Sequence, residues 1–241
     1  MNICIVTEED YIDTDLIFLS GEKAVHLEKI LKSKKGDHIK AGFLNGAMGS
    51  CEILEKKDNG YYLKPNFTMR PPKSPDIILI VALPRPKVAR RVVYNATTLG
   101  VKTIYFINSL RVEKSYWQSP YISEEEVSRQ IILGLEQCVD TIEPEIHMEK
   151  FFKPFVEDRL PLILSKRRGL LMHPYSDSGP VCKVDDPICL IIGPEGGFVE
   201  YENHKIMDAG AEPYSLGRRI LRVETAVTVA VSTFIPLCKN I

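Results

Sequence analysis

The first seventy residues alternate short apolar runs with turns that contain glycine. Two such runs, residues 39–44 and 50–54, stand on either side of Asn45-Gly46. Asn-Gly between two apolar runs is the strongest short-range signal for a β-hairpin. Residues 1–70 are therefore predicted to form a small, mostly β domain.

One helix is expected within this domain, over residues 22–31, with Val25, Ile30 and Leu31 on its buried side. The domain ends at a proline-rich stretch, where residues 70–75 read Arg-Pro-Pro-Lys-Ser-Pro. Proline-rich segments favour extended, semi-rigid conformations that suit a connection between domains. Residues 71–76 are therefore predicted to be a linker.

Beyond the linker the pattern changes to an alternation of apolar runs and helical periodicity. Strands are expected at residues 77–83, 101–107, 160–164, 169–172 and 188–192. Helices are expected at residues 87–98, 123–138 and 225–237. This alternation predicts an α/β domain with a parallel sheet over residues 77–241. In such sheets, ligands bind beyond the carboxyl ends of the strands.

Composition narrows the classes of function without naming one. The formal net charge is −1, so any contact with nucleic acid would depend on local basic clusters. The six cysteines include no Cys-x-x-Cys pair, and we expect neither a metal site nor a disulfide framework. The N-terminus lacks a leader pattern, and no apolar stretch reaches the roughly 18 residues of a membrane span. A cytoplasmic protein without membrane contact is the resulting expectation.

The strand at residues 188–192 runs into the loop Gly193-Pro194-Glu195-Gly196-Gly197. Its glycines allow positive φ angles and a close approach of the backbone to a ligand. The carboxylate of Glu195 suits a cationic ligand, or one with hydroxyl groups, better than a phosphate. The loop matches neither the P-loop pattern nor the dinucleotide-binding fingerprint. An ordinary tight turn remains the alternative for these residues.

A second segment, residues 215–226, reads Ser-Leu-Gly-Arg-Arg-Ile-Leu-Arg-Val-Glu-Thr-Ala. It brings Arg218, Arg219, Arg222 and Glu224 together among apolar positions. A solvated charged face is the alternative interpretation of the arginines. Glu224 begins an apolar helix, where the helix dipole favours a carboxylate, so a structural role competes with a catalytic one.

These two segments together resemble the SPOUT-superfamily RNA methyltransferases. The resemblance is strongest to the family that methylates N3 of one uridine in bacterial 16S rRNA, at position 1498 of that RNA. The tripeptides Met172-His173-Pro174, Glu136-Gln137-Cys138 and Leu99-Gly100-Val101 add to it. The resemblance implies a PUA-like β-barrel over residues 1–70 and a SPOUT methyltransferase domain over residues 77–241. It also implies a C-terminal trefoil knot over about residues 165–235.

The family's cofactor, S-adenosylmethionine, would lie in this knot. The resemblance implies that backbone groups near Leu216 and Leu221 read the adenine, and that Glu195 lies near the ribose hydroxyls or the sulfonium. The residues expected to contact the cofactor are Met172, His173, Pro174, Ile192, Gly193, Pro194, Glu195, Gly196, Gly197, Leu216, Gly217, Ile220, Leu221 and Thr225.

The chemistry at uracil N3 indicates which further residues to consider. N3 carries a hydrogen, so methyl transfer needs a base, or a cation that stabilises negative charge on the ring. Arg219 and Arg222 are the candidates for the cation, because preorganised donors act most strongly on developing charge. Glu224 is the candidate for a general base, although its structural role is the favoured one.

Local basic clusters are the expected contacts with ribosomal RNA or the small ribosomal subunit. Phosphate contacts dominate the affinity of most such interactions. A homodimer formed through the knot domain is expected from the resemblance. The candidate RNA-binding residues are Lys29, Lys32, Lys34, Lys35, Arg85, Lys87, Arg90 and Arg91.

The chain departs from the family pattern at several positions. Asn95 and Thr98 replace a Lys and a Glu, Val139-Asp140 replaces Gly-Arg, and Val199 replaces Ser or Thr. The changes at Asn95, Thr98 and Val139-Asp140 remove polar groups that could face RNA or a second subunit. Two alternatives therefore remain open: a non-catalytic RNA-binding relative, and a methyltransferase that acts on a different RNA nucleotide.

Overall fold

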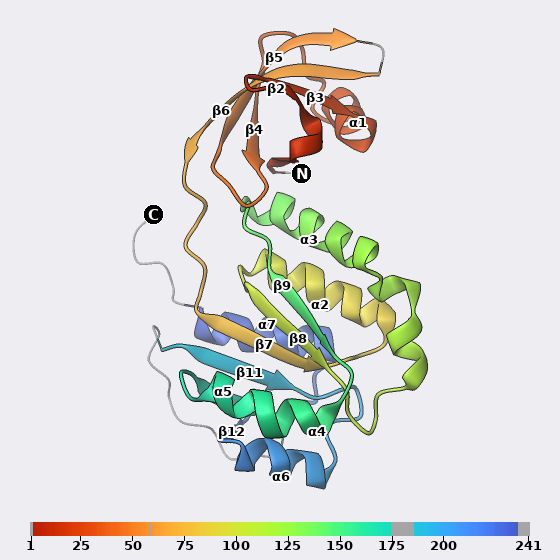
Figure 1. The fold of residues 1–241 in the computed structure, drawn as a ribbon, viewed down its shortest axis with the longest axis vertical. Helices are drawn as coiled ribbons and strands as arrows, with labels where there is room; N and C mark the ends of the chain where they lie inside the picture. The colour runs from red at the N-terminus through yellow and green to blue at the C-terminus, as the bar shows by residue number, and fades with distance from the viewer. Residues whose placement is uncertain (1, 58, 175–185, 236–241) are drawn as a thin grey trace. The chain divides into compact units, whose positions relative to one another are not determined.

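The computed structural model describes residues 2–57, 59–174 and 186–235 (Figure 1). The chain divides into two compact units, and each is described by itself. The first consists of Met1–Lys73 with Ile132–Glu143, and the second of Ser74–Ile131 with Pro144–Ile241. The return of residues 132–143 to the first unit leaves no trace in the hydrophobic pattern, because it depends on tertiary packing.

The first unit is built on a six-stranded mixed sheet with the order β1-β4-β5-β6-β3-β2. Its interior is apolar and includes the fully buried Ile17, Leu19, Ile53 and Leu63. A mostly β first unit is therefore confirmed. The strands are β1 (Cys4–Val6), β2 (Tyr11–Asp13), β3 (Leu16–Ser20), β4 (His38–Phe43), β5 (Met48–Lys57) and β6 (Gly60–Met69).

The hairpin expected around Asn45-Gly46 is present as the antiparallel pair of β4 and β5. Asn45 adopts a positive φ of 59°, a conformation that Asn tolerates better than most residues. The predicted helix is α1 (Gly21–Lys29), but its predicted buried face is wrong. Val25, Ile30 and Leu31 are all exposed.

The buried residues of α1 are Ala24 and Leu27, which stand one turn apart and face the sheet. Ile30 is the C-cap residue, and its side chain is 67% exposed. Because the helix ends at Lys29, Ile30 and Leu31 do not continue the buried face formed by Ala24 and Leu27. A periodicity extended past the true end of a helix assigns the terminal residues to the wrong face.

The second unit contains the parallel sheet that the sequence predicts. Its order is β12-β10-β11-β7-β8-β9, and every neighbouring pair is parallel. The central strands β7 and β11 are buried almost throughout, as expected for a sheet covered on both faces. The strands are β7 (Ile77–Ala82), β8 (Thr103–Ile107), β9 (Glu145–Glu149), β10 (Arg168–Met172), β11 (Ile188–Ile192) and β12 (Ala211–Tyr214).

Helices complete this unit (Figure 1). Helix α2 packs against α7, and the α4–α5 segment packs against α6 through the π-helical turn Phe155–Arg159. Helix α7 begins two residues earlier than expected, and the predicted end at residue 237 lies outside the described residues. The helices are α2 (Pro86–Thr98), α4 (Phe152–Pro154), α5 (Leu160–Leu164), α6 (Glu200–Asp208) and α7 (Val223–Phe234). Helix α3 (Glu124–Cys138) begins in this unit, and its residues from Ile132 onward belong to the first.

The strand predicted at residues 160–164 is wrong, because this segment is helix α5. A short apolar run does not distinguish a strand from a buried helical turn. Pro161 stands in the first turn of the helix, where the missing N–H costs nothing. Leu160 is buried whereas Leu162 is 71% exposed, so the apolar residues do not all face a core.

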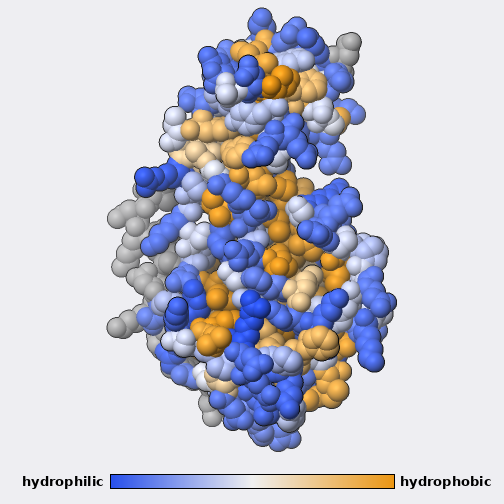
Figure 2. All heavy atoms as spheres, in the orientation of Figure 1, coloured by the Kyte–Doolittle hydropathy of each residue, from blue (hydrophilic) through white to orange (hydrophobic). Residues whose placement is uncertain are grey.

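Apolar patches break up the hydrophilic surface on the face shown in Figure 2. Several large apolar side chains are exposed in the second unit, among them Leu110, Leu162 and Ile220. Single exposed apolar residues are common in folded proteins. Ile220 differs from the others because it also lines a pocket, which is the subject of the next section.

Candidate functional site

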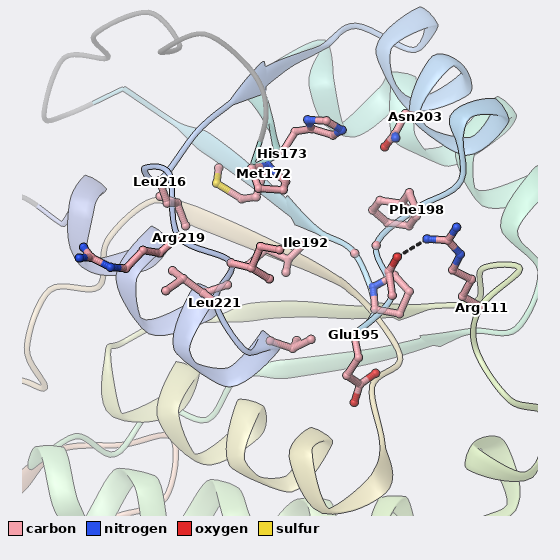
Figure 3. Close-up of a pocket in the computed structure, with 18 of the residues that line it drawn as sticks. Arg111, Met172, His173, Ile192, Glu195, Phe198, Asn203, Leu216, Arg219 and Leu221 are labelled. Atoms are coloured by element: carbon pink, nitrogen blue, oxygen red, sulfur yellow. Dashed lines mark hydrogen bonds between the residues drawn. The ribbon is translucent and has the colours of Figure 1, made fainter.

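A pocket of about 330 Å³ opens at the carboxyl ends of β10, β11 and β12, which are neighbours in the sheet (Figure 3). Three loops, one after each of these strands, form most of its wall. The position agrees with the rule that ligands bind beyond the carboxyl ends of parallel strands. The predicted site residues that line it are 172–174, 192–197, 216–217 and 219–221.

The glycines of the 193–197 loop are explained by backbone conformation and by packing within the protein. Gly197 has a φ of 72°, which favours glycine. A Cβ atom at Gly193 would lie 3.0 Å from the backbone nitrogen of Phe198. One at Gly196 would lie 3.0 Å from Cδ of Arg111. The glycines thus permit a tight loop, and close approach to a ligand is not needed to account for them.

The carboxylate of Glu195 is engaged on the side of the loop that faces α2. Its Oε1 accepts a hydrogen bond of 2.9 Å from the backbone N–H of Arg85, the N-cap residue of α2. In Figure 3 the side chain points towards the N-terminus of that helix. The positive end of the helix dipole attracts a carboxylate. This contact competes with the predicted position of Glu195 beside a ribose or a sulfonium.

The lower wall of the pocket comes from residues 216–221 and the start of α7. Leu216 and Leu221 are half-buried, whereas Ile220 is 74% exposed. Ile192 lies close to them at the end of β11, so apolar side chains from two segments line this part of the pocket (Figure 3). A flat, apolar ring is the kind of ligand group that such walls bind. Thr225, also predicted to contact the cofactor, is exposed on α7 and is not part of the pocket wall.

The three candidate catalytic residues have different surroundings in the structure. Arg219 is exposed and lines the pocket, with its guanidinium extending away from the 193–197 loop (Figure 3). Arg222 is the N-cap residue of α7 and lies outside the pocket wall. Glu224 stands in the first turn of α7, 3.3 Å from Nη1 of Arg91. Its side chain is 14% exposed, and the Arg91 contact joins α7 to α2.

Sequence reasoning missed five pocket residues, which are Arg111, Phe198, Asn203, and Val223 and Ala226 of α7. Arg111 follows β8, and its Nη1 donates a hydrogen bond to the carbonyl oxygen of Gly196 (Figure 3). The signal that could have found it is the rule that placed the other loops, because Arg111 also follows a parallel strand. Phe198 and Asn203 follow β11 and lie close to the motif in sequence, but neither carries a recognisable pattern.

The candidate RNA-binding residues fall into two groups. Lys29, Lys32, Lys34 and Lys35 are all exposed in the first unit. The group on α2 is largely engaged within the protein: Nε of Arg90 lies 2.6 Å from Oε1 of Glu126, and Arg91 contacts Glu224. Lys87 lies over the ring of Tyr121, and Arg85 hydrogen-bonds the Tyr116 side chain. The first group therefore offers the more accessible positive charge.

Each departure from the family pattern on α2 has a contact within the chain. Asn95 Nδ2 lies 3.4 Å from Oγ1 of Thr228 on α7. Thr98 Oγ1 donates a hydrogen bond of 2.8 Å to the carbonyl oxygen of Tyr94. Both residues therefore have roles in helix packing or helix termination. The loss of the family's charged residues does not leave a gap in the fold.

The departure at residues 139–140 forms the end of α3. Asp140 is buried, and its Oδ1 accepts hydrogen bonds from the N–H groups of Thr141 and Ile142. The N–H of Asp140 donates to the carbonyl oxygen of Leu135, as in a helix-terminating motif that normally has glycine at the preceding residue. Val139 holds that position with a φ of 60°. A β-branched residue in place of glycine here is sterically constrained.

Two further observations bear on the type of site. Among residues 2–57, 59–174 and 186–235, no group of three His, Cys, Asp or Glu side chains is arranged to hold a metal ion. No helix in the same ranges is long and apolar enough to cross a membrane. Burial raises the pKa of Cys4, Cys51 and Cys189 to about 12, which makes these thiols poor nucleophiles.

Comparison with known proteins identifies the class. The model of the RNA methyltransferase domain family matches residues 71–235, which include the parallel sheet and the whole pocket. The chain belongs to this family. It is 30% identical to ribosomal RNA small subunit methyltransferase E 1 of Borreliella burgdorferi, over 96% of both chains.

Two other relatives extend the comparison. Ribosomal RNA small subunit methyltransferase E of Treponema pallidum is 26% identical, over 95% of this chain and 89% of that one. The fold matches the structure of ribosomal RNA small subunit methyltransferase E from Neisseria gonorrhoeae bound to S-adenosyl methionine, with a TM-score of 0.73. That match covers 96% of this chain and 95% of the other, at 18% identity.

Proposed function

We propose that the protein transfers a methyl group from S-adenosylmethionine to RNA of the small ribosomal subunit. The observation that carries this proposal is the pocket formed by three loops at the carboxyl ends of β10, β11 and β12. The family match and the names of the full-length relatives support the reaction and its substrate.

The pocket fits the proposed cofactor in size and chemistry. Its volume of about 330 Å³ is at the lower end of the range for small-molecule sites. Ile192, Leu216 and Leu221 would hold the adenine between apolar walls, and nearby backbone groups would read its edge. The bound cofactor supplies an electrophilic methyl group on a sulfonium. Met172, His173 and Pro174 close the side of the pocket that follows β10.

We propose N3 of a uridine as the acceptor, on the basis of the resemblance to the 16S rRNA uracil-N3 methyltransferases. Negative charge spreads over the uracil oxygens when N3 loses its proton. Arg219 is the favoured residue to stabilise this charge, because it lies at the pocket wall. Arg222, three residues further on, would assist from the N-cap of α7. Glu224 is assigned to the α2–α7 ion pair instead of to proton transfer.

We further propose that the enzyme is a homodimer formed through its knotted C-terminal domain, with the first domain contacting RNA. Support for the dimer comes from Ile220, which is 74% exposed beside the pocket and could be covered by a second copy. Support for RNA contact comes from the exposed Lys29, Lys32, Lys34 and Lys35. With a ribosomal RNA substrate, we also propose that the protein acts in the cytoplasm.

A non-catalytic RNA-binding role and a different target nucleotide are the competing proposals. The departures at Asn95, Thr98, Val139 and Asp140 were the reason to consider them. Each of these residues has a structural contact or conformation of its own, so the departures give these alternatives little support.

Calorimetry with S-adenosylmethionine tests the cofactor directly. We expect the chain to bind it with a Kd in the micromolar to millimolar range that is usual for enzyme substrates. Leu221→Asp places a charge in the apolar wall and should abolish binding. Leu162→Asp is the matched control, because Leu162 is 71% exposed and lies outside the pocket. If the unmodified chain fails to bind at millimolar cofactor, the proposal is rejected.

A further inference from the structure

The 193–197 loop is contacted from one side by the loop that follows β8. Arg111 meets Gly196 in two ways. Its Nη1 donates to the carbonyl oxygen of Gly196, and its aliphatic stem fills the space where a Cβ of that glycine would lie. Arg111 thus fixes both the direction of a peptide group and the path of the backbone at the wall of the pocket (Figure 3).

The loop that carries Arg111 is itself anchored by Glu202 of α6. Oε1 of Glu202 accepts a hydrogen bond of 2.7 Å from the N–H of Leu110, and Oε2 accepts one of 3.0 Å from the N–H of Val199. The Glu202 side chain is 3% exposed. A buried carboxylate needs such partners, because an unsatisfied one would be very costly. Glu202 therefore joins the loops after β8 and β11.

From these contacts we infer that Arg111 is a positioning residue for cofactor binding and that Glu202 acts through it. This inference rests on the proposed function. Three glycines make the 193–197 loop conformationally free in isolation, and ordering it upon binding would weaken affinity. Arg111 holds the loop in its bound form before the cofactor arrives. The residue acts on the peptide of Gly196 and takes no part in the methyl transfer.

Arg111→Met tests the role of the guanidinium while keeping an unbranched stem. Removal of one charge-assisted hydrogen bond should raise the Kd for S-adenosylmethionine about tenfold. The KM for the cofactor should rise by a similar factor, whereas the rate at saturating cofactor should stay within about twofold. Because Arg111 is exposed, the melting temperature should not change. Arg111→Lys keeps a donor and should recover part of the affinity.

Lys114→Met is the matched control, because Lys114 is an exposed basic residue near Arg111 and lies outside the pocket wall. It removes the same charge and should leave the Kd unchanged. Glu202→Gln cannot accept both backbone hydrogen bonds, so it should lower the melting temperature and raise the Kd. In the double variant Arg111→Met/Glu202→Gln, the Kd should be no higher than in the weaker-binding single variant, because the two residues act as one unit.

The outcomes separate this inference from the proposed function. If the unmodified chain binds and Arg111→Met binds equally well, the inference is overturned and the proposed function stands. Additive effects on the Kd in the double variant would overturn the role of Glu202 acting through Arg111. If the unmodified chain does not bind S-adenosylmethionine at all, both are overturned together. Should Arg111→Met fail to fold, the comparison of Arg111→Lys with Lys114→Met gives the same decision.

Discussion

Single residues of the pocket owe their identity to two different demands. Gly193 and Gly197 are required by the packing and φ angle of their own loop, and Gly196 by the Arg111 side chain packed against it. Arg219 and Ile220, in contrast, are exposed at the pocket and have no comparable packing role. Exposed arginine and isoleucine side by side are better explained by contact with a ligand or a partner than by the fold.

The two neighbouring arginines of the 215–226 segment allow a paired test of the chemistry. Arg219→Ala should lower the rate of methyl transfer by about 10²- to 10³-fold, because it removes a donor near the developing charge. Arg218→Ala removes the same charge one residue away, outside the pocket wall, and should have little effect. Single-turnover rates with small subunits measure both. Equal rates in the two variants would remove Arg219 from the mechanism.

Val139 provides a test of local strain. A β-branched residue with a φ of 60° is unfavourable, and glycine adopts this conformation without cost. We expect Val139→Gly to raise the free energy of unfolding by about 1 kcal/mol. Val139→Ala keeps a Cβ atom, so its free energy of unfolding should rise by less. Urea unfolding measures the difference, and a loss of stability in Val139→Gly would show that side-chain packing outweighs the strain.

At the scale of elements, the N-terminus of α6 is incompletely capped. Glu202 accepts a hydrogen bond from the N–H of Val199, but the Val199 side chain cannot return one. Val199 is the N-cap residue, and the family pattern has Ser or Thr there. Val199→Thr keeps the shape and supplies an acceptor, so it should stabilise the fold by about 1 kcal/mol. The control Val199→Ala supplies none. A melting temperature of Val199→Thr no higher than that of Val199→Ala would contradict this account.

The elements also show how far hydrophobic pattern determines structure. Fully buried strands such as β7 and β11 are predicted closely, because continuous apolar runs in an alternating α/β pattern are distinctive. The segment of α5 was assigned to a strand, since five apolar residues fit either structure. Strands β9 and β12 were missed because few of their residues are fully buried. Pattern reasoning depends on burial and fails where burial is partial.

The candidate site was predictable in part for the same reason. The 193–197 and 215–226 segments stand out because their charged and glycine residues interrupt apolar runs. Arg111 and Asn203 could not be found in this way, because their places in the pocket depend on the order of strands in the sheet. The contact of Glu224 with Arg91 likewise joins helices 133 residues apart in sequence. Long-range contacts of this kind become visible only in the fold.

For the molecule as a whole, buried thiols predict how stability depends on pH. Burial raises the pKa of Cys189 from 9.0 to about 12. A group whose pKa is higher in the folded state stabilises the fold fully below pH 9 and loses that contribution as pH rises towards 12. Stability should therefore fall over this range. In Cys189→Ala the fall should be shallower, by up to about 1.4 kcal/mol per pH unit. The free energy of unfolding would be measured in urea at each pH. An equally steep fall with pH in both proteins would contradict this prediction.

The most direct test of the whole account is the product of the reaction. Purified protein would be incubated with S-adenosylmethionine and small ribosomal subunits from a strain that lacks the enzyme, and the rRNA nucleosides would be measured by mass spectrometry. The account predicts that 3-methyluridine appears in small-subunit rRNA, and that Arg219→Ala reduces it strongly while Arg218→Ala does not. No methyl transfer, or transfer to a different nucleoside, would contradict it.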